Sequence, residues 1–489
     1  MSCLSGRYTR GGRNGALDMR QTAPNRHFSA IAQKMTAAGM PDLAVRTFQH
    51  YYRQLLDGQS GLLGEDQIGP VQDTPSLAGW AGQTEAGGEA LARTVIIKLN
   101  GGLGTSMGLN QAKSLLPARE NLSFLELIAR QVLHLRITSG HPVPLLLMNS
   151  FNTDADSLNH LARLPDLAAG QAPLPLSFVQ HQVPRLHAAT LDPIEWPAEP
   201  QREWCPPGHG DLYTVLHASG LLADLTARGY RYAFVSNADN LGATLNLDIL
   251  GRFADEEIPF LMEVTERTAA DRKGGHLARD HDGRLVLRES AQCPPDQHEQ
   301  FQDIERYRYF NTNNLWLNLT ALERELKSRD GILGLPMIRN DKHVVPGDSS
   351  TPKVIQLETA MGAAIQIFAN ARILNVPRTR FAPVKTTSDL LALWSDRYRV
   401  DSGGSVLAQT EDPLCTDLDE RYFKTVEDFR ARFPAGAPSL LNAERLAVEG
   451  NILFERDIVV RGRVRLVHRG QSQRRIAAGT VLEDLDETA

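Results

Sequence analysis

Short apolar runs alternate with stretches of helical spacing through the middle of the chain. The runs are rich in valine, isoleucine, leucine and phenylalanine, and most are bounded by polar or glycine-containing segments, which is typical of buried strands. We expect strands at residues 94–99, 143–148, 177–180, 232–236, 260–264, 315–319, 354–357 and 373–376. Strands that alternate with helices in this way predict a three-layer α/β fold with a mostly parallel sheet.

One of the intervening helices is marked at both ends. Ser123 and Glu126 form an S-x-x-E capping box, in which each side chain bonds to the other residue's backbone N–H. An apolar stripe follows at Leu125, Ile128, Val132 and Leu135, and Gly140-His141-Pro142 ends the helical pattern.

The two ends of the chain follow other patterns. Residues 27–56 have helical spacing, and a glycine-rich polar segment from about 57 to 88 reads as a linker. From about residue 445, short β segments are separated by Gly450, Gly462, Gly470 and Gly479, a rhythm that predicts a small all-β unit of β-helix-like coils. We therefore expect an N-terminal lead and helical segment at 1–90, a catalytic domain at 91–398, and a linker with a C-terminal β-helix-like domain at 399–489.

Composition excludes several classes of protein. The net charge of −6 argues against a nucleic-acid binder, and no apolar run is long enough to cross a membrane. The lead carries Arg7, Arg10 and Arg13 but no apolar stretch, so we expect a disordered lead and no secretory signal. The cysteines have no metal-ligand spacing and indicate a reducing compartment, hence a cytoplasmic protein; they are Cys3, Cys205, Cys293 and Cys415.

A glycine-rich loop follows the strand at 94–99. It reads KLNGGLGT over residues 98–105, and Lys113 follows a few residues later. Glycines allow backbone N–H groups to approach an anion closely, and a lysine adds a mobile positive charge, so the stretch predicts a phosphate site. Its spacing matches neither GxGxxG nor the Walker P-loop. The alternative is a glycine-rich turn that serves chain reversal alone.

Other candidate residues follow the strands, where ligands bind in a doubly wound sheet. Asp239 comes after the strand at 232–236 and is suited to hold Mg²⁺ against substrate phosphates; its alternative role is to cap a turn. Lys113 and Lys385 suit the stabilisation of a transferring phosphoryl group, unless both are ordinary surface lysines. His209 lies between two glycines and could be a base, a ligand contact or a structural histidine.

An amide cluster at Asn311, Asn313 and Asn314 offers paired donors and acceptors of the kind that sugar hydroxyls need. Its alternative role is turn capping.

Longer motifs give the chain a resemblance. Between about residues 94 and 398 it contains, in order, KLNGGLGTSMG, WCPPGHGDLY, FVSNADNLGA, LMEVTERTAADRKGG, YFNTNNLWLNL, VIQLETAMGAA and NVPRTRFAPVKTTSDLL. In these blocks it resembles the eukaryotic-type UTP–glucose-1-phosphate uridylyltransferase (UDP-glucose pyrophosphorylase) family. The resemblance implies a Rossmann-like nucleotidyltransferase core of glycosyltransferase-A type and a C-terminal left-handed β-helix-like domain.

The resemblance also implies roles for single residues. Leu99, Asn100, Gly101 and Gly102 would lie along the uridine and its phosphates, and Gln180 and Gly208 would contact the uracil. His209 and Asn237 would contact the sugar nucleotide, and Gly275, Glu289 and Asn313 would bind the glucose hydroxyls. Asp239 would hold Mg²⁺, and Lys113 and Lys385 would bind phosphates. One departure is Gln111-Ala112, which stands where the family often carries Gly-Pro.

The implied reaction is an in-line attack of glucose 1-phosphate on the α-phosphorus of UTP, which yields UDP-glucose and pyrophosphate. The alternatives are a broader UDP-sugar pyrophosphorylase and a non-catalytic UDP-sugar-binding regulator. Relatives that use N-acetylhexosamines end the glycine loop in Thr-Arg-Leu-Gly, whereas Thr105-Ser106-Met107-Gly108 favours glucose. A regulator would be expected to have lost Asp239 or a phosphate lysine, and all are present.

The last residues bear on assembly. Arg456, Arg461, Arg463 and Arg465 predict an exposed, strongly basic strip on the C-terminal unit, which is a poor surface for apolar self-association. Octameric relatives also continue beyond the point where this chain ends. We expect a monomer or weak dimer, with small-molecule partners only and no nucleic-acid or membrane partner. We also expect the tail to pack on the catalytic domain without a part in the chemistry.

Overall fold

A computed structural model describes residues 19–119, 121–268, 271–272, 274–410, 412 and 414–488. The lead with Arg7, Arg10 and Arg13 lies outside these residues. None of the helices in the described ranges is long and apolar enough to span a membrane.

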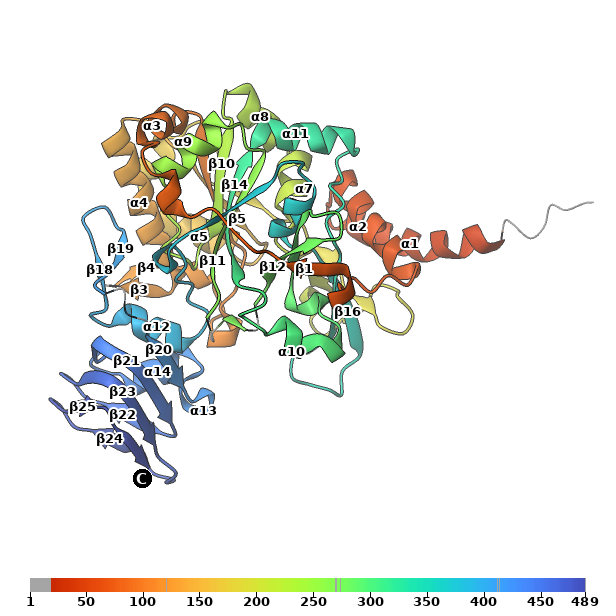
Figure 1. Cartoon of the computed structure of the whole chain (residues 1–489). Helices are drawn as coiled ribbons and strands as arrows, with labels where there is room; N and C mark the ends of the chain where they lie inside the picture. Colours follow the sequence, from red (N-terminus) through yellow and green to blue (C-terminus); the bar gives the residue numbers. More distant parts are fainter. Residues whose placement is uncertain are drawn as a thin grey trace, which may run out of the picture.

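The helices and strands are numbered along the chain, as in Figure 1. The helices are α1 (Met19–Ala37), α2 (Asp42–Leu56), α3 (Thr84–Leu91), α4 (Phe124–Ser139), α5 (Asp154–Leu161), α6 (Pro165–Ala169), α7 (Asp211–Ala218), α8 (Leu221–Ala227), α9 (Leu247–Asp255), α10 (His298–Phe301), α11 (Leu319–Ser328), α12 (Thr387–Trp394), α13 (Glu420–Phe423) and α14 (Val426–Arg432). The strands are β1 (Ile68–Pro70), β2 (Thr94–Asn100), β3 (Pro117–Arg119), β4 (Leu122–Ser123), β5 (Leu145–Asn149), β6 (Ser177–Val179), β7 (Val183–Pro184), β8 (Leu186–His187), β9 (Trp204–Cys205), β10 (Tyr232–Asn237), β11 (Phe260–Glu266), β12 (His276–Asp280), β13 (Leu285–Arg288), β14 (Tyr309–Asn318), β15 (Ile338–His343), β16 (Lys353–Glu358), β17 (Arg372–Asn375), β18 (Tyr398–Val400), β19 (Val406–Ala408), β20 (Cys415–Leu418), β21 (Ser439–Glu449), β22 (Ile452–Phe454), β23 (Val459–Val467), β24 (Arg474–Ile476), β25 (Val481–Glu483) and β26 (Asp486–Thr488).

A large central sheet organises the molecule, with the strand order β1-β12-β14-β10-β2-β5-β6. Strands β10, β2, β5 and β6 run parallel, so their carboxyl ends lie along one edge. The antiparallel strand β14 joins this parallel part to β12 and to β11, and β17 adds a parallel partner to β11. The mixed α/β fold with its mostly parallel centre is the one that the sequence predicts.

Helices cover both faces of this sheet (Figure 1). Alternate residues of β2 point to opposite faces: Ile96 lies in the core shared with α3, α4 and α9, while Val95 and Ile97 lie in the core shared with α7, α8 and α11. The α4 capping box is confirmed, since Glu126 N–H donates to Ser123 Oγ and Ser123 N–H to Glu126.

Each predicted strand is present, with two differences. Strand β16 belongs to a separate three-stranded sheet with β15 and β8. Strand β14 begins at Tyr309, earlier than expected, so the amide cluster lies inside the strand and not before it. The predicted helical spacing at 27–56 corresponds to α1 and α2.

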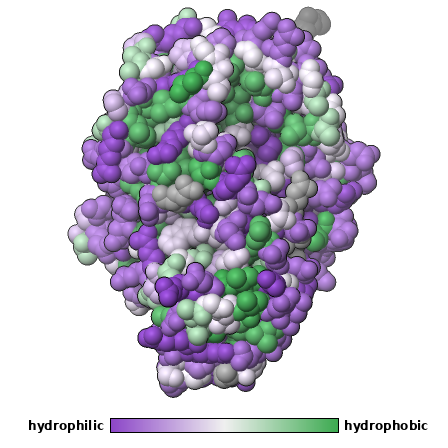
Figure 2. Space-filling model, turned by 90° about the vertical axis from the view of Figure 1, so that its left-hand side faces the viewer, coloured by the Kyte–Doolittle hydropathy of each residue, from purple (hydrophilic) through white to green (hydrophobic). Residues whose placement is uncertain are grey.

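The C-terminal unit consists of strands stacked in parallel. β20, β21, β23 and β25 are parallel neighbours, and β22 pairs with β24 in a second parallel ladder. The arginines of the expected basic strip are exposed, but the strip is not strongly basic, because the stacking places acids beside them: Arg461 pairs with Glu483, and Arg465 with Glu449. Apolar side chains also reach the surface in the lower part of Figure 2.

Candidate active site

Register places the predicted site residues at one edge of the sheet. The last residue of β10, Asn237, pairs with Leu99 of β2, and Asn100 pairs with Asn149 of β5. The glycine loop after β2 therefore starts beside the loop after β10 that carries Asp239. Gln180 follows β6 at the same edge, where its N–H donates to Asn149 O.

Two lysines converge on Asp239. Lys113 Nζ and Lys385 Nζ donate to the same atom, Asp239 Oδ2, at 2.9 and 3.0 Å. Lys113 also donates to the carbonyl of Val384, which ties the glycine-loop segment to the segment that carries Lys385. Burial alone would raise the pKa of Asp239, but Lys385 and Lys113 lower it below its ordinary value. The carboxylate is thus ionised beside two ammonium groups.

The second oxygen of Asp239 fits a metal ion. Asp239 Oδ1 is buried and has no hydrogen-bond partner among the residues that the structure describes. Within the same residues, no group of three or more His, Cys, Asp or Glu side chains could hold a metal by itself. A single carboxylate with an open oxygen suits Mg²⁺, which often takes one or two protein carboxylates and completes its shell with phosphate and water.

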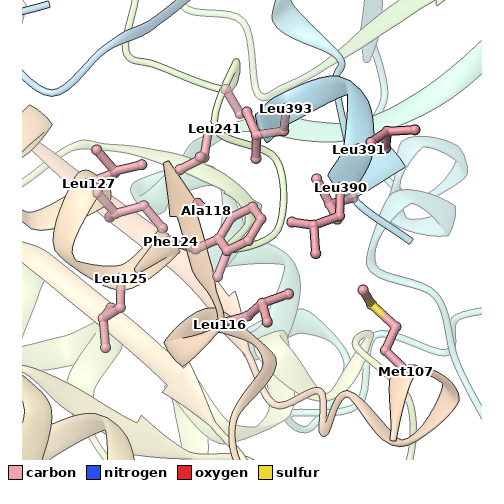
Figure 3. Close-up of a cluster of buried hydrophobic side chains, with 14 of the residues drawn as sticks. Met107, Leu116, Ala118, Phe124, Leu125, Leu127, Leu241, Leu390, Leu391 and Leu393 are labelled. Carbon is pink, nitrogen blue, oxygen red and sulfur yellow. The ribbon is translucent and has the colours of Figure 1, made fainter. Parts of the chain in front are cut away.

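The glycine loop presents bare backbone beside Gln180. A side-chain carbon on Gly101 would lie 2.7 Å from Gln180 Nε2, so a larger residue here would displace the Gln180 amide. Lys113 N–H donates to Gly102 O at 3.0 Å and closes the loop. Figure 3 shows how the loop is anchored: Met107 points into the cluster that contains Phe124 of α4 and Leu390 of α12.

His209 is held in one tautomer next to a glycine that packs tightly. Its Nδ1 accepts a hydrogen bond from the Met361 N–H at 2.9 Å, which leaves Nε2 to carry the proton as a donor. Burial and the charge of Lys385 lower the pKa of His209 to about 4, so the ring is neutral near pH 7. Gly208 has φ +80° and its Cα packs against Thr359 O, where a side chain would clash.

A second group of predicted site residues lies on β14 and at the ends of β12 and β13. Asn313 lies in β14 with φ +58°, opposite an irregularity in the register between Glu263 and Val264. This left-handed conformation, which asparagine tolerates, lets Asn311 and Asn313 hydrogen-bond to each other twice, at 2.9 Å. Gly275 packs against Glu289, whose Oε2 would be 2.6 Å from a side-chain carbon there. Burial raises the pKa of the Glu289 carboxyl to about 7.

One predicted residue has its side chain turned inward. The Asn100 amide is buried and donates to Asn149 Oδ1 and Ser157 Oγ, both at 2.8 Å. The Asn100 carbonyl is also engaged, because it accepts from Thr153 Oγ1 at 2.8 Å. The nearby Asn314 is likewise engaged in the core, where it donates to Glu263 at 3.0 Å.

The segment 416–425 contacts the loops that carry Lys113 and Lys385, which sequence reasoning missed. Gly108 of the glycine loop packs against Thr425, so closely that a side-chain carbon would lie 2.9 Å from the threonine Cβ. At the start of α12, Thr387 Oγ1 donates to Phe423 O, and Ser388 Oγ accepts from the Leu418 N–H. The segment 416–425 therefore holds the loops that carry Lys113 and Lys385. These contacts come from the stretch expected to be a linker, before residue 445. The expectations that the tail from about residue 445 packs on the catalytic domain and has no part in the chemistry stay predictions.

Comparisons with known proteins identify the family to which the chain belongs. A family model described as UTP–glucose-1-phosphate uridylyltransferase matches residues 45–461. A probable UTP–glucose-1-phosphate uridylyltransferase from Schizosaccharomyces pombe is 40% identical over 407 residues, which cover 82% of this chain and 79% of the relative. The Saccharomyces cerevisiae enzyme is 41% identical over 401 residues, covering 81% of this chain and 78% of that one.

Solved structures give the same result. A variant of UDP-glucose pyrophosphorylase from Leishmania major in complex with UDP-glucose superposes with a TM-score of 0.89 at 41% identity, covering 95% of this chain and 99% of that one. The Trypanosoma brucei UDP-glucose phosphorylase superposes with a TM-score of 0.87 at 41% identity and covers 94% of this chain and 99% of its own. The chain belongs to the UTP–glucose-1-phosphate uridylyltransferase family.

Proposed function

We propose that the edge of the sheet around Asp239 is where this chain joins UTP and glucose 1-phosphate to give UDP-glucose and pyrophosphate. Family membership supports the reaction. The assignment of the site rests on one observation: Lys113 and Lys385 both bond to Asp239, beside the glycine loop. Phosphoryl chemistry needs this combination of cations, an anionic metal ligand and free backbone N–H groups.

In the proposed mechanism, the protein positions the substrates and neutralises charge. A phosphate oxygen of glucose 1-phosphate attacks the α-phosphorus of UTP in line, the new P–O bond forms, and the bond to pyrophosphate breaks. Lys113 and Lys385 would stabilise the negative charge on the phosphates. The backbone of residues 99–102 would lie along the uridine and its phosphates, and His209 Nε2–H and Asn237 would contact the sugar nucleotide. Mg²⁺ held at Asp239 would supply further charge neutralisation to the phosphates.

Base selection is assigned to Gln180 and Gly208, and it can be tested with a panel of nucleotides. The Gln180 amide can both accept from and donate to the uracil edge, and a polar pocket rejects bases that leave its groups unpaired. We expect kcat/KM for CTP, ATP and GTP to be at least about 100-fold below that for UTP. Gln180→Ala should reduce this ratio. A coupled pyrophosphate-release assay measures it.

The matched control for this experiment is Gln182→Ala, an amide two residues along the same segment with no assigned role, which should leave the ratio unchanged. Equal use of ATP and UTP by the unaltered protein would overturn the uridylyl assignment. A panel of sugar 1-phosphates in the same assay tests the broader UDP-sugar pyrophosphorylase alternative, and a complete lack of turnover would favour the regulator.

The sugar site is assigned to Gly275, Glu289 and Asn313, and the pKa of Glu289 makes it testable. With a pKa of about 7, Glu289 changes from a carboxylic acid to a carboxylate as the pH rises through 7. The carboxylate accepts stronger hydrogen bonds from sugar hydroxyls, so KM for glucose 1-phosphate should fall roughly five- to tenfold between about pH 6 and pH 8.

Glu289→Gln is the control, because its amide does not titrate. This variant should keep only the dependence caused by the substrate phosphate, which titrates near pH 6. If the variant showed the full pH dependence of the unaltered protein, Glu289 would not be the titrating group.

Predictions on the domains, the C-terminal fold, the assembly and the location accompany this function. We propose domain limits of 1–90, 91–398 and 399–489, and a left-handed β-helix for the C-terminal unit, supported by its parallel ladders. We propose a monomer or weak dimer that acts on small molecules alone. A cytoplasmic location is supported by the free thiols of Cys205, Cys293 and Cys415.

A further inference from the structure

A cluster of buried charges lies behind the site, and the proposed mechanism does not use it. Glu263 of β11 is fully buried, at 0% exposure, yet its carboxylate accepts four hydrogen bonds. Arg380 donates two of them, from Nε at 2.8 Å and from Nη2 at 2.6 Å. Trp316 Nε1 and Asn314 Nδ2 donate the others, each at 3.0 Å. Arg380 is itself only 9% exposed, so the pair is removed from water.

The cluster connects two segments that meet at Asp239. Arg380 Nη2 donates to Thr244 O at 2.9 Å, and Lys98 of β2 donates to the neighbouring Ala243 O at 2.7 Å. Two basic side chains therefore hold successive carbonyls of the segment 239–244. The backbones also touch at Gly242, where a side-chain carbon would lie 2.3 Å from Thr379 O.

Further bonds hold the segment 380–385 along the first one. Asn240 Nδ2 donates to Arg380 O at 3.1 Å, and Asn240 Oδ1 accepts from the Ala382 N–H at 3.1 Å. The Val384 N–H then donates to Asp239 O at 3.1 Å, directly before Lys385. The position of the Lys385 backbone relative to Asp239 thus depends on a chain of contacts that begins at Arg380.

We propose that Glu263 is a positioning residue for the uridylyl transfer, which fixes the guanidinium of Arg380 and through it the segment that carries Lys385. This inference rests on the proposed function of Lys385. Glu263 reaches no substrate, because its carboxylate is fully enclosed. A buried ion pair is weak evidence for stability by itself, since well-packed apolar residues can replace one without loss. The guanidinium of Arg380 donates two parallel hydrogen bonds to the carboxylate, which Asn314 and Trp316 also hold in place. Such fixed geometry suits the placement of a loop.

Glu263→Gln in combination with Lys385→Ala tests the proposal. The single change keeps the volume but leaves Arg380 buried beside a neutral amide, so Lys385 should be displaced and kcat should fall roughly 10- to 100-fold. In the Lys385→Ala protein, the same change should alter kcat by less than about twofold, because the group it positions is already gone. Equal factors in both backgrounds, or an unchanged kcat in the single variant, would overturn the proposal.

Two further variants complete the design. Glu203→Gln breaks the ion pair with Lys34, which has no part in the proposed mechanism, and should lower the melting temperature without changing kcat. Arg380→Lys keeps the positive charge but loses the paired hydrogen bonds of the guanidinium to Glu263. If Glu263→Gln does not fold, Arg380→Lys replaces it, and kcat is compared in the unaltered protein and in Lys385→Ala. A normal kcat in Lys385→Ala would instead mean that the proposed role of Lys385 has failed.

Discussion

Replacing Asp239 by asparagine is expected to abolish turnover, with a loss of roughly three orders of magnitude in kcat. The amide has nearly the same volume, so the loop after β10 should keep its course. It carries no negative charge, however, and cannot supply the anionic ligand that Asp239 Oδ1 offers. Its NH₂ group would also face the ammonium groups of Lys113 and Lys385. Steady-state pyrophosphate release with excess Mg²⁺ measures the effect.

Asp224→Asn provides the control for this change. It removes a carboxylate of α8 from an exposed ion pair with Arg228, before β10 and not in the loop that follows it, and should leave kcat unchanged. Circular dichroism should report the same fold for both variants. Turnover near that of the unaltered protein in Asp239→Asn would show that this carboxylate is not required.

Lys113→Ala and Lys385→Ala should each lower kcat/KM by about 100-fold or more, because each removes a cation that stabilises charge in the transition state. Their effects on stability should differ. Lys385 is 57% exposed, so its loss should change the free energy of unfolding by less than about 0.5 kcal/mol. Lys113 is 14% exposed and also bonds to Val384 O, so its loss should destabilise by about 1–3 kcal/mol.

Lys327→Ala on α11 removes an exposed lysine paired with Glu323 and should change neither quantity. Kinetics and thermal unfolding of the purified variants separate the two effects. A variant that unfolds more readily but keeps its rate would assign that lysine to structure alone.

The residues that follow parallel strands could be predicted from the sequence. Asp239 and Gln180 were identified because the ends of parallel strands meet at one edge, a rule that needs only the apolar runs. The sequence places Asn311 and Asn313 before a strand expected to begin at residue 315, because a left-handed residue inside a strand breaks the alternation on which strand prediction depends. The acidic partners of Arg461 and Arg465 lie 22 and 16 residues away along the chain, and single-residue charge patterns do not show this.

The buried cluster shows a different limit. Glu263 stands in an apolar run and reads as one polar position of a strand, while its partner Arg380 is 117 residues away. No local pattern relates two such residues. The same holds for the two lysines, which only the folded chain brings to one carboxylate oxygen.

Residues 416–425 contact the glycine loop and α12. These contacts affect the order in which parts of the enzyme form during synthesis. Domains generally fold as they leave the ribosome, the N-terminal part first. Here the loop at 101–108 emerges more than 300 residues before Thr425, the residue against which it packs. A nascent chain can therefore form its sheet early but completes the contacts around its phosphate loops only near the end of synthesis. Synthesis that stops prematurely before this segment would yield a folded sheet whose phosphate loops lack their final support.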